Sequence, residues 1–371
     1  MPCDRPHVLP LIAAWVLAFC PGWVLPVAGE ILPVLPAEAV PKPPVKVFYA
    51  LDLSVLGPDR EPDRAIVRRM VDALVRGVTA RPSAASAWRT LVSPTDVVGI
   101  KVSTAAGPIG GTKPAVVEAV AAGLREAGIP RERILVWDRN KEDLLTAGFR
   151  TNSGLYTLRW INPADGYDKK AQVSAPVLGK LVWGDRAFGI LEDQRSADLM
   201  DNGEQLSNRS FFAGILSRDV TKVIHIPSAT DSFLTGINGA LADMTLSNLD
   251  NWRRFVRAPD HGDPYLAEIY SDPMIREKVV LTLLDALVLQ YAGGPGPNPN
   301  FTSDNMAVFA SRDPVAIDAT LLEMLEELRK QAKLPPLAPM TRYIQSATQL
   351  GLGEHSPARI ESVRAGIDAL R

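Results

Sequence analysis

Cysteine is almost missing from this chain of 371 residues. The two cysteines, Cys3 and Cys20, both lie in the first 20 residues, and a chain without that segment has none. Such a chain can form no disulfide framework, use no thiol nucleophile and hold no iron–sulfur cluster through cysteine. Histidine is also scarce, because only His225, His261 and His355 follow the first segment, which argues against a His-rich zinc site.

An excess of charge of either sign is missing as well. The formal net charge is −2 and charged residues make up 22% of the chain, so there is no basic surface to suggest a nucleic-acid partner. A hydrophobic content of 46% is ordinary for a globular protein, and the length suits one large or two medium domains. The sequence contains no Walker A motif, no HExxH, no EF-hand loop and no nucleophile elbow.

The first residues have the pattern of an export signal. Arg5 precedes an apolar run over residues 8–27, which three prolines interrupt, and Val27-Ala28-Gly29 offers small residues for cleavage. We expect residues 1–29 to be a signal peptide, residues 30–44 a proline-rich linker, and the mature protein to be periplasmic or extracellular. Cleavage at 37–39 and an uncleaved membrane anchor are the alternatives, although prolines disfavour a spanning helix. We expect no membrane span in the mature chain.

Buried strands and amphipathic helices alternate along the rest of the chain. Strands are expected at 45–51, 96–102, 134–137, 222–227, 279–284, 306–310 and 359–363, and helices at 62–78, 113–127, 235–244, 264–271, 314–330 and 343–350. This order predicts an α/β domain over 45–371, with an open, mostly parallel sheet covered by helices on both faces. Residues 150–217 break the rhythm and are expected to form a small antiparallel or irregular insertion.

A glycine-rich loop follows the strand that carries Lys101. Gly107, Gly110 and Gly111 could let main-chain amides approach an anion at the start of the next helix, with Lys101 and Lys113 adding positive charge. A plain turn that needs glycine for its backbone angles explains the same residues.

Other polar side chains stand where strands end. Asp138 directly follows a strand and can either face a ligand crevice or cap the helix that begins near residue 141. Asp231 and Asn238 lie in a segment whose glycines suggest either ligand approach or close helix packing.

His261 and Asp263 lie in one turn and form, with Asp285 and Lys101, the predicted catalytic set. A histidine beside carboxylates can transfer protons, or the group can hold a divalent ion such as Mg²⁺ or Ca²⁺. For Asp263, which precedes a proline, a helix cap is the favoured alternative.

Two further aspartates lie near the C-terminal helix that begins at residue 314. Asp313 before Pro314 is expected to cap that helix. Asp318 is surrounded by apolar residues, so it is either exposed or placed in a pocket with a perturbed pKa.

Together these segments resemble a known family. VGIKVSTAAGPIGGTKPAVVEAV, IHIPSATDSFLTGINGALADM, HGDPYLAEIYSDPMIREKV and SRDPVAIDA, in this order, are similar to the domain-of-unknown-function 362 family, and especially to its exported branch. The resemblance implies an α/β fold with a ligand pocket at the strand ends, and it implies no particular activity. Some relatives carry ferredoxin-type cysteine clusters, which this chain lacks.

The chain departs from that family in one segment. Relatives usually carry a lysine, a histidine and a second lysine where this chain has Thr230, Ser232 and Ala242, and a cysteine where it has Gly262. The basic groups expected to hold an anion are therefore replaced. Three functions stay open: a small-molecule enzyme, a protein that binds a small molecule or ion without turnover, and an envelope interaction protein using residues 150–217. No cofactor follows with certainty.

Overall fold

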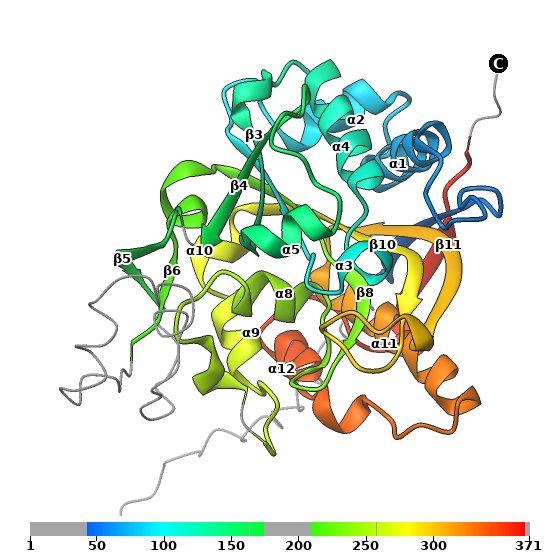
Figure 1. Ribbon diagram of the computed structural model, residues 1–371, viewed down its shortest axis with the longest axis vertical. Helices are drawn as coiled ribbons and strands as arrows, with labels where there is room; N and C mark the ends of the chain where they lie inside the picture. Colours follow the sequence, from blue (N-terminus) through cyan, green and yellow to red (C-terminus); the bar gives the residue numbers. More distant parts are fainter. Residues whose placement is uncertain (1–42, 163, 174–208, 257, 368–371) are drawn as a thin grey trace, which may run out of the picture. The chain divides into compact units, whose positions relative to one another are not determined.

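The computed structural model describes residues 43–162, 164–173, 209–256 and 258–367. In these residues a ten-stranded sheet forms the centre of an α/β fold (Figure 1), as the sequence predicted. Its main path runs β12-β1-β11-β10-β7-β2-β3-β4, and the short strands β8 and β9 join beside β10. The strands are β1 Val45–Leu51, β2 Val98–Val102, β3 Ile134–Asn140, β4 Thr157–Asn162, β7 Lys222–Ile226, β8 Ser228–Ser232, β9 Gly236–Ile237, β10 Val279–Gln290, β11 Thr302–Ser311 and β12 Ile360–Arg364.

The central strands run parallel. β10, β7, β2, β3 and β4 pair in parallel with one another, and so do β1 and β12. β11 is antiparallel to both of its neighbours, β1 and β10. The sheet is therefore mixed but mostly parallel, and the carboxyl ends of its parallel strands share one edge.

Two hydrophobic layers cover the two faces of this sheet. One layer packs α1 Arg64–Thr79, α2 Ala84–Leu91 and α4 Pro114–Glu126 against alternate strand residues such as Val98, Ile100 and Val136. The other packs α8 Ala240–Leu246, α9 Tyr265–Tyr270, α11 Pro314–Gln331 and α12 Tyr343–Gln349 against residues such as Val223 and Trp137. Figure 1 shows the two groups of helices on opposite sides of the strands. Because side chains alternate along a strand, Lys101 and His225 face the second layer.

Helix capping agrees with part of the sequence analysis. Asp313 caps α11 by accepting a hydrogen bond from the amide of Ala316 at 2.8 Å, as predicted. The two other capping alternatives are wrong. The cap position of α9 is Pro264, and Asp263 accepts instead from the hydroxyl of Ser346 at 2.6 Å. α5 Lys141–Thr146 has Asn140 at its cap position, so Asp138 does not cap this helix.

Several element boundaries differ from those expected. β10 continues for six residues beyond Leu284, so Asp285 lies inside the strand and not at its end. The segment expected as a helix from residue 235 forms β9 first, and α8 begins only at Ala240, because Gly236 adopts a φ of 76° that no helix accommodates.

The insertion also needs a correction. β5 Tyr167–Gln172 and β6 Phe211–Ala213 do form a small antiparallel sheet, but β4 within the same range is a parallel strand at the edge of the main sheet. Residues 174–208 of the insertion, like the expected leader and most of the linker, lie outside the described residues. In the part of the chain that the structure describes, no helix combines the length and apolar character that a membrane crossing requires.

Candidate functional site

A buried charge cluster lies at the carboxyl ends of β2, β3 and β7. Its centre is Lys101, which has no exposed surface. The Lys101 Nζ donates to Asp138 Oδ1 at 2.9 Å, to both carboxylate oxygens of Asp243 at 3.0 and 3.1 Å, and to the carbonyl of Val102. The ammonium group is thereby surrounded by acceptors from β2, β3 and α8.

Asp138 links this cluster to the loop after β2. Its second oxygen, Oδ2, accepts from the amide of Thr104 at 2.8 Å and from the hydroxyl of the same residue at 2.6 Å. Its Oδ1 also accepts from the amide of Arg139. Of the two roles predicted for Asp138, the side chain therefore takes the one that faces the strand ends, and 8% of it stays exposed.

Two members of the cluster, His225 and Asp243, were not among the predicted site residues. Asp243 on α8 accepts from Lys101, lies 2.8 Å from Nε2 of His225, and accepts from the hydroxyl of Ser247 at 2.9 Å. His225 stands beside Lys101 in the register of β7 and β2. The available signal was a histidine within the apolar strand segment KVIHI and an aspartate within the apolar helix ALADMTL.

The pKa shifts follow from this arrangement. Burial works against the charged form of Lys101, but the attraction of Asp138 and Asp243 outweighs it and raises the pKa of the ammonium group. Burial also opposes the charged form of Asp243, yet Lys101 and His225 lower the pKa of that carboxyl to about 2. Burial lowers the pKa of His225, so its imidazole is neutral at pH 7. The cluster then carries two negative charges against one positive charge.

The strand order indicates that this location is suited to binding a ligand. The chain passes from β2 outward through β3 to β4, and later returns to β7 on the opposite side of β2. The order of strands therefore reverses between β2 and β7. In open α/β sheets, ligands bind outside the carboxyl ends of the strands at such a reversal point.

The glycine loop after β2 does not present its glycine amides to a ligand. It forms the single turn α3 Gly107–Gly110, in which the amides of Gly107, Gly110 and Gly111 donate to the carbonyls of Thr104, Ala106 and Gly107. Gly107 has a φ of 67°, and a Cβ on Gly111 would lie 2.5 Å from the carbonyl oxygen of Gly107. These three glycines therefore serve the turn itself, which is the alternative explanation that the sequence left open.

Lys113 and Asp285 fasten the end of this loop. Asp285 Oδ2 accepts from the main-chain amide of Lys113 at 2.7 Å, and Oδ1 accepts from the amide of Leu287 at 3.2 Å. The Nζ of Lys113 turns back onto the carbonyls of Pro108 and Ile109. Burial raises the pKa of Asp285 and lowers that of Lys113. Asp285 therefore connects β10 to the start of α4 and has no hydrogen bond with the Lys101 cluster among the described residues.

Asn238 lies at the rim of the site, while Asp231 supports a neighbouring loop. The Asn238 Nδ2 donates to the hydroxyl of Ser103 at 2.9 Å, and Asn238 remains half-buried. Asp231 Oδ1 accepts from the amide of Gly294 at 2.9 Å, and burial raises its pKa. Ser103 and Thr104 are adjacent, so Asn238 and Asp138 are held by consecutive residues of one loop.

His261 and Asp263 lie with a different part of the fold. His261 Nδ1 is 2.9 Å from the carbonyl oxygen of Leu234, and Asp263 bonds to Ser346 on α12. Among the described residues, no hydrogen bond or ion pair joins either side chain to Lys101 or Asp285. The four residues predicted as one catalytic set therefore do not form one hydrogen-bonded group.

Asp318 connects two helices of the second layer. Its carboxylate accepts from the amide of Ala240 at 2.5 Å and from that of Leu241 at 2.9 Å, so α11 holds the start of α8. Burial raises the pKa of Asp318 to about 7, although both hydrogen bonds act in the other direction. Because α8 carries Asp243, Asp318 supports the site without lying in it.

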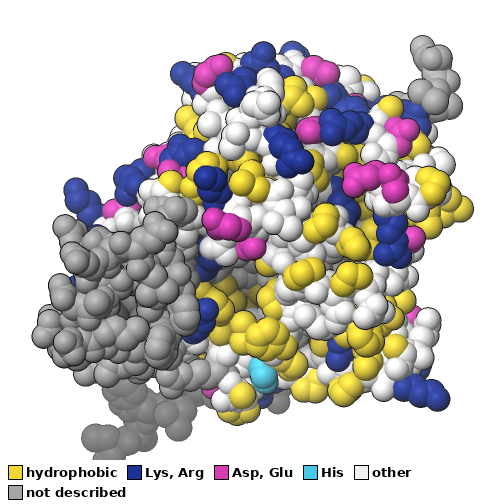
Figure 2. Space-filling model, in the orientation of Figure 1, with side chains coloured by type: hydrophobic (Ala, Val, Ile, Leu, Met, Phe, Trp, Pro, Cys, Tyr) yellow, Lys and Arg dark blue, Asp and Glu magenta, His cyan; other side chains and the backbone are white. Residues whose placement is uncertain are grey.

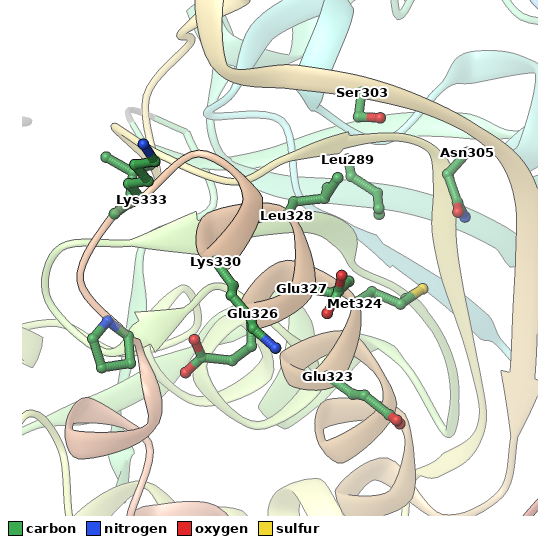
Figure 3. A pocket seen from close by; sticks show the side chains of 12 residues that line it. Leu289, Ser303, Asn305, Glu323, Met324, Glu326, Glu327, Leu328, Lys330 and Lys333 are labelled. Atoms are coloured by element: carbon green, nitrogen blue, oxygen red, sulfur yellow. The ribbon is translucent and has the colours of Figure 1, made fainter.

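A large cavity lies away from this cluster. It measures about 1020 Å³ and lies between α11 and the strands β10 and β11 (Figure 3). Leu289 and Leu328 approach each other there, and Glu326 in its wall already accepts from the amides of Leu337 and Ala338. None of the predicted site residues lines it, and size alone does not supply converging polar groups.

Within the described ranges, no group of three or more His, Cys, Asp and Glu side chains is placed to hold a metal ion. In the cluster, the ammonium group of Lys101 occupies the position between the two carboxylates.

Comparison with known proteins identifies the family. A family described as domain of unknown function (DUF362) matches residues 98–323, which is more than half of the chain. The chain belongs to the DUF362 family. A crystal structure of a protein from Thermotoga maritima is similar to it at 13% identity and a TM-score of 0.35, over 74% of this chain and 60% of the other, less than two thirds of that chain's length. No curated protein matches the sequence.

The three positions at which the resemblance implies basic residues in relatives are buried in this chain. Thr230 and Ser232 lie on β8, and Ala242 lies on α8. Thr230 Oγ1 has no hydrogen-bond partner among the described residues, and Ser232 Oγ accepts from the amides of Leu234 and Thr235. These positions place no basic group beside the Lys101 cluster.

Proposed function

We propose that this protein of the DUF362 family is exported and binds a small polar molecule at the carboxyl ends of β2, β3 and β7, without turning it over. The observation that carries the proposal is the buried cluster of Lys101, Asp138, Asp243 and His225 at the reversal point of the sheet. Buried ionised groups cost stability unless they are fully paired, and perturbed groups of this kind gather at functional sites.

The charge of the cluster indicates the class of ligand. Two carboxylates face one ammonium group and a neutral imidazole, and the glycine amides of the nearby loop are already occupied. A negative rim attracts hydrogen-bond donors and cations and repels anions. We therefore expect a neutral polyol-like or an amine-bearing ligand, contacting the partly exposed Asp138 and Asn238.

The pairing of the charged groups favours binding over catalysis. The charged atoms of Lys101, Asp138 and Asp243 are all held by hydrogen bonds to one another or to Thr104, so none of them is free to exchange a proton with a ligand. A general acid or base must reach the proton that it transfers. The rigid cluster instead fixes the three segments that surround the rim, which favours a preorganised binding site.

An enzyme is the second candidate, because one atom of the cluster stays free. His225 Nδ1 is buried and has no hydrogen-bond partner among the described residues, while Nε2 is held by Asp243. A neutral imidazole oriented by a carboxylate is suited to act as a general base. Because His225 lies beneath α8, this function requires α8 to move before a substrate reaches Nδ1.

A thermal-unfolding screen tests the binding proposal. The folded protein is heated with neutral polyols, with primary amines and with carboxylates, each at equal ionic strength. We expect polyols or amines to raise the midpoint temperature, and Asn238→Ala to remove that rise. Asn305→Ala is the matched control, because Asn305 is also half-buried but lines the cavity beside α11.

The outcomes separate the candidates. A rise caused by carboxylates alone, or one that Asn305→Ala removes and Asn238→Ala does not, contradicts the proposal. If a stabilising compound is consumed during incubation, and His225→Gln stops the consumption but keeps the stabilisation, the enzyme is the better description.

Export is the remaining part of the proposal and rests on the sequence of residues 1–29. N-terminal sequencing of the protein recovered outside the cytoplasm tests it. We expect the mature chain to begin after Gly29. A chain that keeps residues 1–29 and stays with the membrane fraction supports the anchor instead.

A further inference from the structure

We infer that a second site, separate from the Lys101 cluster, binds a small organic anion at the carboxyl ends of β1 and β12. A cavity of about 770 Å³ opens there, between the end of β1, α1 and the residues that follow β12. Arg69 and Arg364 contribute the basic side chains of its wall, and Asp52 contributes an acidic one.

Arg69 is the residue that makes this cavity unusual. Its Nε and Nη1 atoms are buried, and neither has a hydrogen-bond partner among the described residues. A guanidinium group stays charged at all ordinary pH values, so it cannot escape the cost of burial by losing its proton. A buried donor without an acceptor destabilises the folded protein. Each missing partner is an acceptor. Nε and Nη1 lie on different edges of the guanidinium group, so a molecule with several anionic oxygens, such as a polycarboxylate or a phosphate, suits them once the side chain turns toward the cavity.

Arg68, which precedes Arg69 on α1, has acceptors for its guanidinium group. Arg68 Nε donates to Asp72 at 2.9 Å, and its Nη2 donates to Glu126 at 2.7 Å. Arg69 follows it directly on α1 but turns toward the end of β1, where the structure places no carboxylate within ion-pair distance of it. The described part of the chain therefore supplies hydrogen-bond acceptors to Arg68, whereas Arg69 has only the longer-range attraction of Asp52.

Arg364 adds a second positive charge to the lining of the cavity. It is the last residue of β12, it is exposed, and it forms no ion pair with any described residue. Residues 365–367 also line the cavity. Two arginines that line one cavity and form no ion pair with a described residue make it attractive to a molecule with more than one anionic oxygen.

Asp52 limits which anions fit. Its Oδ1 accepts from the amide and the hydroxyl of Ser54 at 2.9 and 2.6 Å, and these bonds lower the pKa of the carboxyl. It is therefore ionised at pH 7 and leaves the net charge of the three side chains at one positive unit. A ligand that carries a hydroxyl or amino group besides its anion satisfies Asp52 and both arginines, whereas a bare ion satisfies only the arginines.

Thermal unfolding of the full chain tests this site with two probes, sodium phosphate and sodium citrate, against sodium chloride at equal ionic strength. At a probe concentration of about ten times Kd, we expect a rise of the order of 2–4 °C in the midpoint temperature. Arg69→Met should remove the rise. In chloride alone, the same substitution should raise the midpoint, because it deletes the buried unpaired donors and keeps the aliphatic stem.

Matched variants decide whether the effect belongs to this cavity. Arg125→Met replaces an exposed arginine of α4 that does not line the cavity, and it should leave both responses unchanged. Arg364→Met should weaken the response, and this exposed position keeps the test usable if Arg69→Met does not fold. Asn238→Ala should keep it in full, which separates this site from the one proposed above.

Each outcome bears on the inference. A response to citrate alone identifies a carboxylate ligand, and a response to phosphate alone identifies a phosphorylated one. The inference is overturned if neither probe raises the midpoint in the unmodified protein, if Arg125→Met removes the rise as fully as Arg69→Met, or if Arg69→Met and Arg364→Met both leave it intact.

Discussion

Lys101 and His225 lie opposite each other on the neighbouring parallel strands β2 and β7, and both side chains reach the same carboxylate, Asp243. One residue of α8 therefore joins the two central strands at the point where the strand order reverses. Asp138 extends this connection to β3. The cluster fixes three strands and one helix relative to one another at the sheet edge where a ligand is expected.

Removal of Lys101 should be strongly destabilising. Lys101→Met leaves Asp138 and Asp243 buried without their counter-charge, and we expect the free energy of unfolding to fall by about 3–5 kcal/mol. Urea denaturation followed by circular dichroism measures the loss. Lys46→Met is the control, because Lys46 is 55% exposed and lies 4.0 Å from Glu361, so the change should be below about 1 kcal/mol.

The same cluster predicts coupling between its members. When Asp243→Asn is added to Lys101→Met, one of the uncompensated charges disappears, so the double variant should lose less stability than the sum of the single variants. Strict additivity of the two losses would show that the ion pair contributes nothing specific.

Asp318 should make stability fall as the pH rises toward neutrality. Its pKa is about 7 in the folded protein and 3.8 for an ordinary aspartate, so between these values the folded state binds the extra proton. The free energy of unfolding should therefore decline from about pH 4 upward, by an amount on the order of 3 kcal/mol by pH 7. Unfolding at pH 4.5, 5.5 and 6.5 measures this slope.

The variant Asp318→Asn separates this residue from the others. It does not titrate, so its stability should change less between pH 4.5 and 6.5 than that of the unmodified protein. It also loses one of the two acceptors for α8, so it should be less stable at the acidic end. An unchanged slope in Asp318→Asn would assign the pH dependence to other groups.

Gly239 should tolerate no side chain. A Cβ at this position would overlap Asp318 Oδ1, which is held in place by the amides of α8. We expect Gly239→Ala to cost about 2–4 kcal/mol, within the range of severe core substitutions. Gly154→Ala provides the control, because a Cβ there meets nothing within 4 Å, and its effect should stay within about 0.5 kcal/mol.

Asp285 should matter for folding more than an exposed aspartate of the next strand. Asp285→Ala leaves the amide of Lys113 buried without its acceptor, and we expect a loss of about 2–3 kcal/mol in thermal or urea unfolding. Asp304→Ala removes an ion pair with Arg60 in which the two side chains are 35% and 36% exposed. The free energy of unfolding should therefore fall by less than about 1 kcal/mol. Equal losses at the two positions would contradict the role given to Asp285.

The strand and helix pattern predicted the α/β architecture because buried parallel strands form continuous apolar runs. Lys101 and Asp138 were recognised as site candidates for a related reason: each is a charged residue at the end of such a run. Their mutual contact could not be predicted, because the strand order, and hence which ends are neighbours, depends on pairings between distant segments.

His225 and Asp243 were missed because each lies inside an apolar segment, where local pattern rules see only a strand or a helix. Their polarity is explained only when α8 packs over β7. His261 and Asp263, which share one turn, were grouped with Asp285 because Asp285 was expected at the end of a buried strand. In the fold, His261 contacts Leu234 and Asp263 contacts Ser346. Each contact joins segments that are distant in the sequence, so local patterns could not predict it.

The pairing of β1 has a consequence for how the protein is made. This first strand has β11 and β12 as its neighbours, and these end at residues 311 and 364. During synthesis, β1 therefore cannot pair with both of its neighbouring strands until almost the whole chain has left the ribosome. Its backbone donors and acceptors stay unpaired in that interval, which is a hazard for aggregation. The domain can finish folding only after translation is nearly over.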